Sequence, residues 1–289
     1  MTSFALTLGQ RVRDGFEFVK FSHTIFALPF AFISMVVAAK GLPAIGTVFW
    51  ILVCMVAART LAMCFNRLVD WNLDQENPRT ENRHRLMDKF GAQALAVAAL
   101  LLFTYGTLQL NMLCVVLGPV AVALITFYSI TKRFTAYSHL FLGLALSAAP
   151  MGAWVAVTGE LWSVVPYLLS LAVLLWVAGF DIIYATMDID FDQAAGLNSI
   201  PARFGVEVAL KISQWCHICS VVVFGVFGWQ FGGGWFFTVA WLLVCAGLVY
   251  EQLLSTSRNP NLLNKAFFHV NAFVSVVLLI GVCLDVFLR

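Results

Sequence analysis

Charged residues are scarce in this chain: Asp, Glu, Lys and Arg together make up 11% of its 289 residues. Hydrophobic residues make up 61%, and the mean hydropathy is +0.90. A water-soluble globule of this length needs more polar surface than such a composition supplies, so a soluble protein is excluded. The scarcity of charge instead predicts a protein that is surrounded mainly by lipid.

The chain also lacks the features that divide a sequence into soluble domains or that bind nucleic acid. It contains no linker, low-complexity tract or block of like charge, and its net charge is only +2. Its basic residues are spread among short polar segments, so nucleic acid is not an expected partner. Its seven cysteines lie mostly in apolar stretches, where they are expected to act as small apolar side chains rather than as disulfides.

Nine apolar stretches have about the twenty-residue length that crosses a bilayer. They are expected at residues 18–39, 44–65, 91–110, 112–128, 139–157, 162–184, 208–230, 234–254 and 267–287. Only a tight turn near Asn111 separates the third from the fourth, so a re-entrant hairpin is the alternative there. The stretches predict an all-α, polytopic membrane protein with nine transmembrane helices.

Lys and Arg residues gather on one side of the predicted membrane. Fifteen of the seventeen lie at the N-terminus, in alternate polar loops or at the span ends beside those loops, whereas Lys40 and Arg289 fall on the other side. The positive-inside rule makes the first side cytoplasmic. The sequence therefore predicts a multi-pass protein of the cytoplasmic (inner) membrane, with the lipid bilayer as a partner.

The order of the polar loops indicates a loose internal duplication. Each half has an acid-rich loop after its second span, at 66–90 and 185–206, and a shorter polar loop after its fourth, at 129–138 and 255–266. The halves share little sequence, so the repeat is one of topology. We expect one membrane domain of two loosely repeated halves, with a functional site in a central cavity where the halves meet.

Two acidic runs in these loops carry the strongest chemical signal. In NRLVDWNLD, Asn66, Asp70 and Asp74 follow every four residues and share an arc of roughly 80° if the helix is continuous. In DIIYATMDIDFD, three acidic residues share an arc of about 40° on a continuous helix, and a tyrosine lies beside them. These residues are Asp181, Asp188, Asp192 and Tyr184. Two such carboxylate stripes repel each other and resist desolvation unless cations lie between them.

The surroundings of these runs suit a metal-bound diphosphate. Mg²⁺ prefers oxygen ligands and commonly bridges carboxylates to substrate phosphates. Basic residues follow each run, and in the first loop they include Arg79 and Arg83. Lys132, with Tyr128 one helical turn before it, lies on the same membrane side and is expected to touch a phosphate. The alternatives are carboxylates that begin helices in solvated loops and, for Lys132, simple positive-inside anchoring.

Two further charges are expected deeper in the membrane. Arg59 lies seven residues before Asn66, and Asp181 lies seven before Asp188, so each continues an acidic face about two turns inward. Intramembrane charges cost roughly 2.5–3.5 kcal/mol each on insertion scales and mark functional interiors. Either Arg59 and Asp181 form a structural ion pair, or Arg59 receives an acidic ligand in the central cavity.

Together these motifs resemble those of the UbiA superfamily of intramembrane prenyltransferases. The resemblance covers nearly the whole chain, with N-x-x-x-D-x-x-x-D, D-x-x-Y-A-x-x-D-x-x-x-D and the continuation GLNSIPARFG. It implies one prenyltransferase domain over residues 1–289, with a lateral opening to the bilayer for an isoprenoid tail. The implied ligands of two Mg²⁺ ions are Asn66, Asp70, Asp74, Asp188 and Asp192. The implied contacts of the diphosphate are Arg79, Arg83, Lys132 and Tyr128.

The segments AARTLAMCFNRLVD and FVKFSHTIFALPFAF resemble the 4-hydroxybenzoate polyprenyltransferase branch, especially an offshoot assigned to the futalosine route, whose acceptor is thought to be a dihydroxynaphthoate. This implies transfer from polyprenyl diphosphate to an aromatic acid in ubiquinone or menaquinone biosynthesis. The alternatives are another UbiA-type acceptor (an ether lipid, haem or chlorophyll) and, in a different class, a cation-coupled transporter. The predicted catalytic residues are Asp70, Asp74, Asp181, Asp188 and Asp192. The predicted substrate-binding residues are Arg59, Arg79, Arg83, Tyr128, Lys132 and Tyr184.

Overall fold

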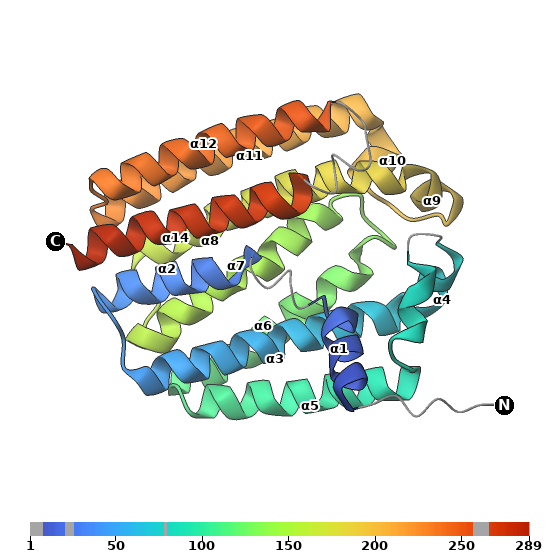
Figure 1. Ribbon diagram of the computed structural model, residues 1–289, viewed down its shortest axis with the longest axis horizontal. Coiled ribbons are helices and arrows are strands. Elements are labelled where there is room, and N and C mark those ends of the chain that lie inside the picture. Colours follow the sequence, from blue (N-terminus) through green and yellow to red (C-terminus); the bar gives the residue numbers. More distant parts are fainter. Residues whose placement is uncertain (1–7, 21–25, 78–79, 257–265, 289) are drawn as a thin grey trace.

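The computed structural model describes residues 8–20, 26–77, 80–256 and 266–288 (Figure 1). Within these ranges the chain forms helices and no strand, which confirms the predicted all-α class. Among the described residues, eight helices are long and apolar enough to cross a membrane, and each matches a predicted span. They are α3 Ile45–Val69, α5 Lys89–Leu108, α6 Met112–Thr131, α7 Ser138–Thr158, α8 Val164–Ala185, α11 Val206–Phe231, α12 Trp235–Ser255 and α14 Asn271–Phe287.

The first expected span, 18–39, forms only a short apolar helix. This helix, α2 (Leu28–Ala39), has twelve residues and is therefore about 18 Å long at about 1.5 Å per residue. Pro29 lies in its first turn, where the fixed φ of proline favours the start of a helix. A separate helix, α1 (Leu8–Phe18), precedes it. The chain thus has eight full-length helices and a short ninth within the described ranges.

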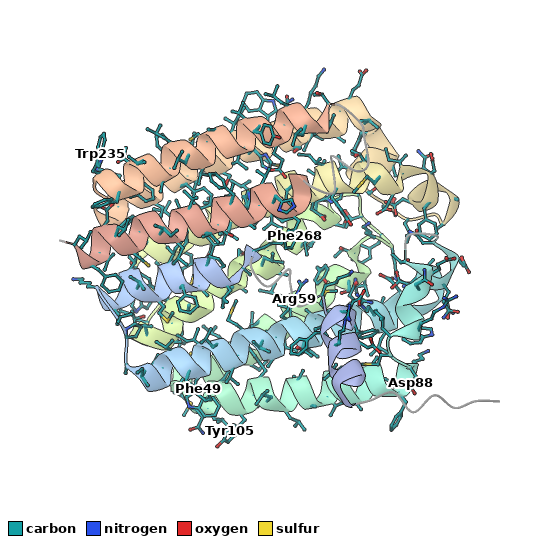
Figure 2. All side chains as sticks on the ribbon, in the orientation of Figure 1. Phe49, Arg59, Asp88, Tyr105, Trp235 and Phe268 are labelled. Atoms are coloured by element: carbon teal, nitrogen blue, oxygen red, sulfur yellow. The ribbon has the colours of Figure 1, made fainter. Side chains whose placement is uncertain are left out.

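The two ends of the helix bundle differ in character. Short helices follow α3 and α8 at the end drawn on the right in Figure 1. They are α4 Trp71–Glu76, η2 Glu81–Arg85, η3 Thr186–Asp188, α9 Ile189–Ala194 and α10 Ile200–Phe204. The short η4, Ala266–Val270, precedes α14. Figure 2 shows Phe49, Tyr105 and Trp235 at the opposite end. All three are exposed, which is typical of aromatic residues at a membrane–water boundary.

Helix packing agrees with the predicted topological repeat. α3 packs against α5 and α6, and α8 packs against α7 and α11. In each half, therefore, the helix before the acidic segment packs on the next long helix after it. α2 packs against α7 and α14, and α14 packs against α12. The centre of the second half is α8, whose Trp176 is fully buried and meets the ring of Phe180 edge-on.

The long helices do not continue through the acidic residues, so the predicted single helix faces of 80° and 40° are wrong. α3 ends at Val69, and Asp70 has a non-helical φ of −96° and ψ of 17° before α4 begins. The Nη2 atom of Arg133 donates to the Val69 carbonyl at 2.8 Å, which satisfies a group that the helix end exposes. α8 ends at Ala185, where the Thr186 hydroxyl donates to its own helix and a 3₁₀ turn follows.

Candidate active site

A cavity of about 740 Å³ lies between α3, α6, α7 and α8. Most of its lining is apolar, and it extends from Asn66 near the acidic end to Ile51 and Ala156 near the opposite end. Figure 2 shows Arg59 in the interior of the bundle rather than at either end. Five residues predicted for the site line this cavity, namely Arg59, Asn66, Tyr128, Asp181 and Tyr184.

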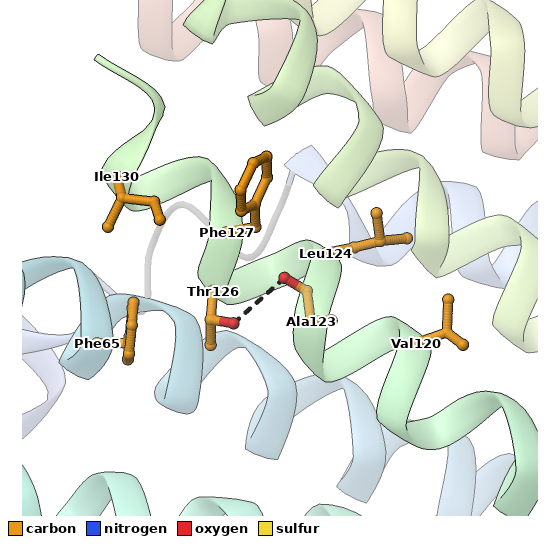
Figure 3. A pocket seen from close by; sticks show the side chains of 7 residues that line it. All are labelled: Phe65, Val120, Ala123, Leu124, Thr126, Phe127 and Ile130. Atoms are coloured by element: carbon orange, nitrogen blue, oxygen red, sulfur yellow. Dashed lines mark hydrogen bonds between the residues drawn. The ribbon is translucent and has the colours of Figure 1, made fainter. Parts of the chain in front are cut away.

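A second pocket of about 400 Å³ runs along α6 beside Phe65 of α3 (Figure 3). Val120 and Leu124 line both this pocket and the central cavity. The Thr126 hydroxyl donates to the Ala123 carbonyl of its own helix at 3.2 Å, so the polar group in the pocket is satisfied locally. Val120 is exposed on an apolar helix, so it lies at a surface that lipid would cover. Because Val120 also lines the central cavity, the cavity reaches that surface.

Two consecutive basic residues at the end of α6 contact one acidic segment each. Arg133 Nη2 lies 3.0 Å from Asp70 Oδ1, at the end of α3. Lys132 Nζ lies 3.8 Å from Asp192 Oδ2, in α9. Since Lys132 and Arg133 are neighbours in the chain, the two acidic segments lie on either side of one turn. A shared site requires this arrangement.

The second acidic segment is also attached to the same turn through its backbone. The amide N–H and the side-chain amide of Asn198 both donate to the Lys132 carbonyl, at 2.7 and 3.3 Å. Asp192 is only 2% exposed, and its Oδ2 accepts no hydrogen bond from any described residue. Lys132 Nζ, 3.8 Å from this buried oxygen, lies beyond hydrogen-bond distance, so Asp192 Oδ2 suits a cation ligand.

The first acidic segment is half-buried. Burial raises the pKa of the Asp70 carboxyl above its usual range, whereas the hydrogen bond and the charge of Arg133 lower it, and the neighbouring Asp74 raises it. The Thr80 hydroxyl donates to the Asp74 carbonyl at 2.9 Å and holds the short helix α4 in place. In the part of the chain that the structure describes, no three His, Cys, Asp or Glu side chains form one group that could hold a metal ion.

Comparison with known proteins identifies the family. A family model described as the UbiA prenyltransferase family matches residues 27–276. The chain belongs to this family. The UbiA assignment confirms the predicted class of enzyme, a prenyltransferase, and the predicted membrane fold. It favours an enzyme over the transporter alternative.

Individual relatives support the same assignment. The chain is 30% identical over 257 residues to a 4-hydroxybenzoate octaprenyltransferase of Vibrio parahaemolyticus, a match covering 86% of this chain and 87% of that protein. The apo structure of a UbiA homologue from Aeropyrum pernix K1 is 31% identical, with a TM-score of 0.83 and coverage of 91% and 98%. A UbiA homologue from Archaeoglobus fulgidus, solved with DMAPP and Mg²⁺, is 18% identical with a TM-score of 0.70 over 93% and 99%. The last likeness shows the fold alone.

Arg59 and Asp181 do not form the ion pair that was one of the two alternatives for Arg59. Within the described ranges, no carboxylate lies within 4.0 Å of the Arg59 guanidinium, and its buried Nε has no hydrogen-bond partner. Asp181 instead contacts His139, with 2.6 Å between Oδ2 and Nδ1. Of the two interpretations of Arg59, a cation that receives an acidic ligand fits these contacts better.

Two basic residues predicted to contact the diphosphate cannot be placed. Arg79 lies outside the described residues, and only the backbone of Arg83, in η2, is described. Conversely, neither His139 nor Arg133 was predicted as a site residue. A histidine near the start of an apolar span is usually a core residue, and a Lys-Arg pair at a membrane edge is usually an anchor. Neither signal distinguishes a site residue from a structural one.

Proposed function

We propose that this chain catalyses Mg²⁺-dependent transfer of a polyprenyl group from a polyprenyl diphosphate to an aromatic acid. One observation above all supports the proposal. Lys132 and Arg133 join the two acidic segments at the polar end of an apolar cavity that contains Arg59. The acidic end suits a metal diphosphate, the buried cation suits an acidic acceptor, and the apolar cavity suits an isoprenoid tail.

The donor set of the acidic end fits Mg²⁺. The side chains that would hold the ions are Asn66, Asp70, Asp74, Asp188 and Asp192, and all of them offer oxygen atoms, the ligands that Mg²⁺ prefers. Mg²⁺ usually takes its remaining ligands from substrate phosphates and water. When bound, Mg²⁺ neutralises the diphosphate and stabilises it as a leaving group.

Residues at the end of α6 would bind the phosphate oxygens. Lys132 is half-exposed beside Asp192, so its ammonium can contact both the carboxylate and a phosphate. Tyr128 lines the cavity one turn deeper and can donate its hydroxyl. Arg79 and Arg83 remain predicted contacts of the diphosphate. We propose that this end of the bundle faces the cytoplasm, because the basic residues gather there.

Arg59 would bind the carboxylate of the acceptor. An acidic ligand would satisfy the Nε that lacks a partner, and the charge-assisted hydrogen bond is strong in an apolar cavity. The names of the relatives favour 4-hydroxybenzoate as the acceptor. The dihydroxynaphthoate implied by the sequence segments is also an aromatic acid and would use Arg59 in the same way.

The apolar lining of the cavity would protect the reacting carbon. As the bond to the diphosphate breaks, the prenyl carbon becomes an allylic cation that water would quench. The rings of Phe180 and Tyr184 line the cavity on α8 and can stabilise that cation through their faces. The electron-rich acceptor ring then attacks this carbon, and a carbon–carbon bond forms.

The experiment that tests this function is a prenyl-transfer assay with a panel of acceptors. Membranes containing the chain are incubated with labelled polyprenyl diphosphate and with 4-hydroxybenzoate, a dihydroxynaphthoate, an ether-lipid precursor or haem. We expect a prenylated product with an aromatic acid and its loss when a chelator removes Mg²⁺. A product formed only with the lipid or haem acceptor would contradict the proposal, as would no product at all. Membranes without the chain are the control.

A further inference from the structure

A buried histidine beside the cavity has no part in the function described so far. His139 is the second residue of α7 and has no exposed surface. Its Nδ1 lies 2.6 Å from Asp181 Oδ2 on α8, and its Nε2 accepts a hydrogen bond from the Ile200 amide at 3.4 Å. Ile200 is the first residue of α10, which follows the second acidic segment. His139 therefore links a cavity residue to that segment.

These two contacts define which nitrogen of His139 carries the proton. The Ile200 amide can only donate, so Nε2 must be the unprotonated nitrogen that accepts. Nδ1 then carries the proton and donates to the Asp181 carboxylate. An imidazolium would point an N–H at the amide N–H, so the hydrogen-bond network assigns the ring with its proton on Nδ1.

Asp181 has one oxygen held by His139 and one that is not. Its side chain is 22% exposed and lines the cavity together with Arg59 and Tyr184. Its Oδ1 receives no hydrogen bond from the residues for which positions are given. A carboxylate fixed through one oxygen, with the other left for a ligand, has the arrangement of a general base.

We propose that His139 is a positioning residue, which holds Asp181 as the base of the prenyl transfer. The inference rests on the proposed function. The bond from the first carbon of the prenyl group to the diphosphate oxygen breaks, diphosphate leaves, and the acceptor ring carbon then bonds to that prenyl carbon. The proton on the attacked ring carbon passes to Asp181 Oδ1 and then to water, which restores the aromatic ring. His139 orients Asp181 and does not itself touch the acceptor.

Two substitutions at this position separate the hydrogen bond from the bulk of the ring. Asn places an amide donor near the position of Nδ1, whereas Leu fills the volume without a donor. A misplaced catalytic group lowers the reaction rate by up to roughly 100-fold. We therefore expect His139→Leu to lower kcat about 10- to 100-fold, with little change in the KM of the polyprenyl diphosphate or of the aromatic acid. His139→Asn should recover most of that loss.

An isotope effect distinguishes positioning from a general structural defect. With 4-hydroxybenzoate deuterated at the alkylated ring carbons, His139→Leu should show a larger primary isotope effect on kcat than wild type, because proton removal becomes slow. The matched control is His217→Leu, which removes another buried histidine, on α11, that bonds Gln252 instead of a cavity residue. The control should lower thermal stability without raising the isotope effect.

A full kcat in His139→Leu, a loss without an isotope effect, or failure of Asn to rescue would each overturn the inference. A separate measurement keeps it distinct from the proposed function. In ¹⁵N spectra of the full-length protein in detergent, His139 should be protonated at Nδ1, and Asp181→Ala should remove that signature. If wild type prenylates no aromatic acid but the signature is found, the acceptor assignment fails and the contact stands. Protonation at Nε2 would overturn the positioning role itself.

Discussion

Arg133 donates a hydrogen bond from Nη2 to Oδ1 of Asp70 at 3.0 Å, so the turn after α6 is attached to the end of α3. The preceding residue, Lys132, lies beside Asp192 on the other acidic segment. Two acidic segments at one end of an apolar bundle repel each other, and adjacent cations between them reduce that repulsion. The pair thus allows the two motifs to share one site.

Replacing Arg133 with Gln should lower the catalytic efficiency with polyprenyl diphosphate. The change removes the hydrogen bonds to Asp70 and to the Val69 carbonyl, so the first acidic segment is held less firmly. Because the pair is partly exposed, we expect kcat/KM for the polyprenyl diphosphate to fall only about fivefold. Lys211→Gln removes an exposed cation of α11 and is the control. Equal losses of kcat/KM in the two variants would mean that only the net charge of the protein affects the reaction with polyprenyl diphosphate.

Replacing Arg59 with Gln should affect the acceptor more than the diphosphate. A charge-assisted hydrogen bond contributes about 1.5–3 kcal/mol, so loss of the cation should raise the acceptor KM roughly 10- to 100-fold. The KM of the polyprenyl diphosphate should change little, since Arg59 lies deeper than the acidic segments. Steady-state kinetics with each substrate varied in turn checks this prediction. Equal changes in the two KM values would count against the acceptor role.

Gly152 of α7 offers a way to shorten the cavity. It lines the cavity, and a Cβ atom at this position would meet no atom within 4 Å. Gly152→Phe should therefore fill space that a long isoprenoid needs, and turnover of octaprenyl diphosphate should fall at least about tenfold. Geranyl diphosphate should still react. Gly46→Phe, at another open position that does not line the cavity, is the control and should accept both chain lengths.

Asp285 should contribute to stability rather than to catalysis. Its Oδ2 accepts hydrogen bonds from the amides of Gly234 and Phe237, each at 2.7 Å, and it is 4% exposed. Asp285→Ala leaves these buried donors unsatisfied and should cost about 1–3 kcal/mol, with a lower Tm in detergent. Asp285→Asn keeps one acceptor oxygen, so its Tm should lie between those of wild type and Asp285→Ala. An Ala variant that melts like wild type would show that water replaces the carboxylate.

The positions of the membrane helices could be predicted because apolar length alone determines them. All eight long helices overlap the expected stretches, and the turn near Asn111 separates two helices of twenty residues each. The start of α2 could not be predicted, because hydropathy does not register the positive φ of 48° at Lys20 or the preference of Pro29 for the first turn of a helix.

The candidate site was predictable only in part. The spacing of Asn66, Asp70 and Asp74 indicated a set of ligands, but α3 ends at Val69, where Arg133, 63 residues away from Asp70, contacts both Val69 and Asp70. Likewise, Arg59 and Asp181 line one cavity as expected, but the sequence left open whether they pair, and His139 contacts Asp181 Oδ2 instead. Both contacts join residues that are distant in the chain, and a periodic pattern carries no information on such pairs. The roles of the individual acidic residues stay predictions.

The most direct test of one shared site is the turnover of Asp70→Asn, Asp188→Asn and the double variant. Activity with polyprenyl diphosphate and an aromatic acid is measured across a Mg²⁺ titration, with folding checked by size exclusion and circular dichroism. If both segments form one site, each single variant loses turnover, and the double variant loses no more than the worse single one. Wild-type turnover in either single variant, or losses that simply multiply in the double variant, would contradict the account.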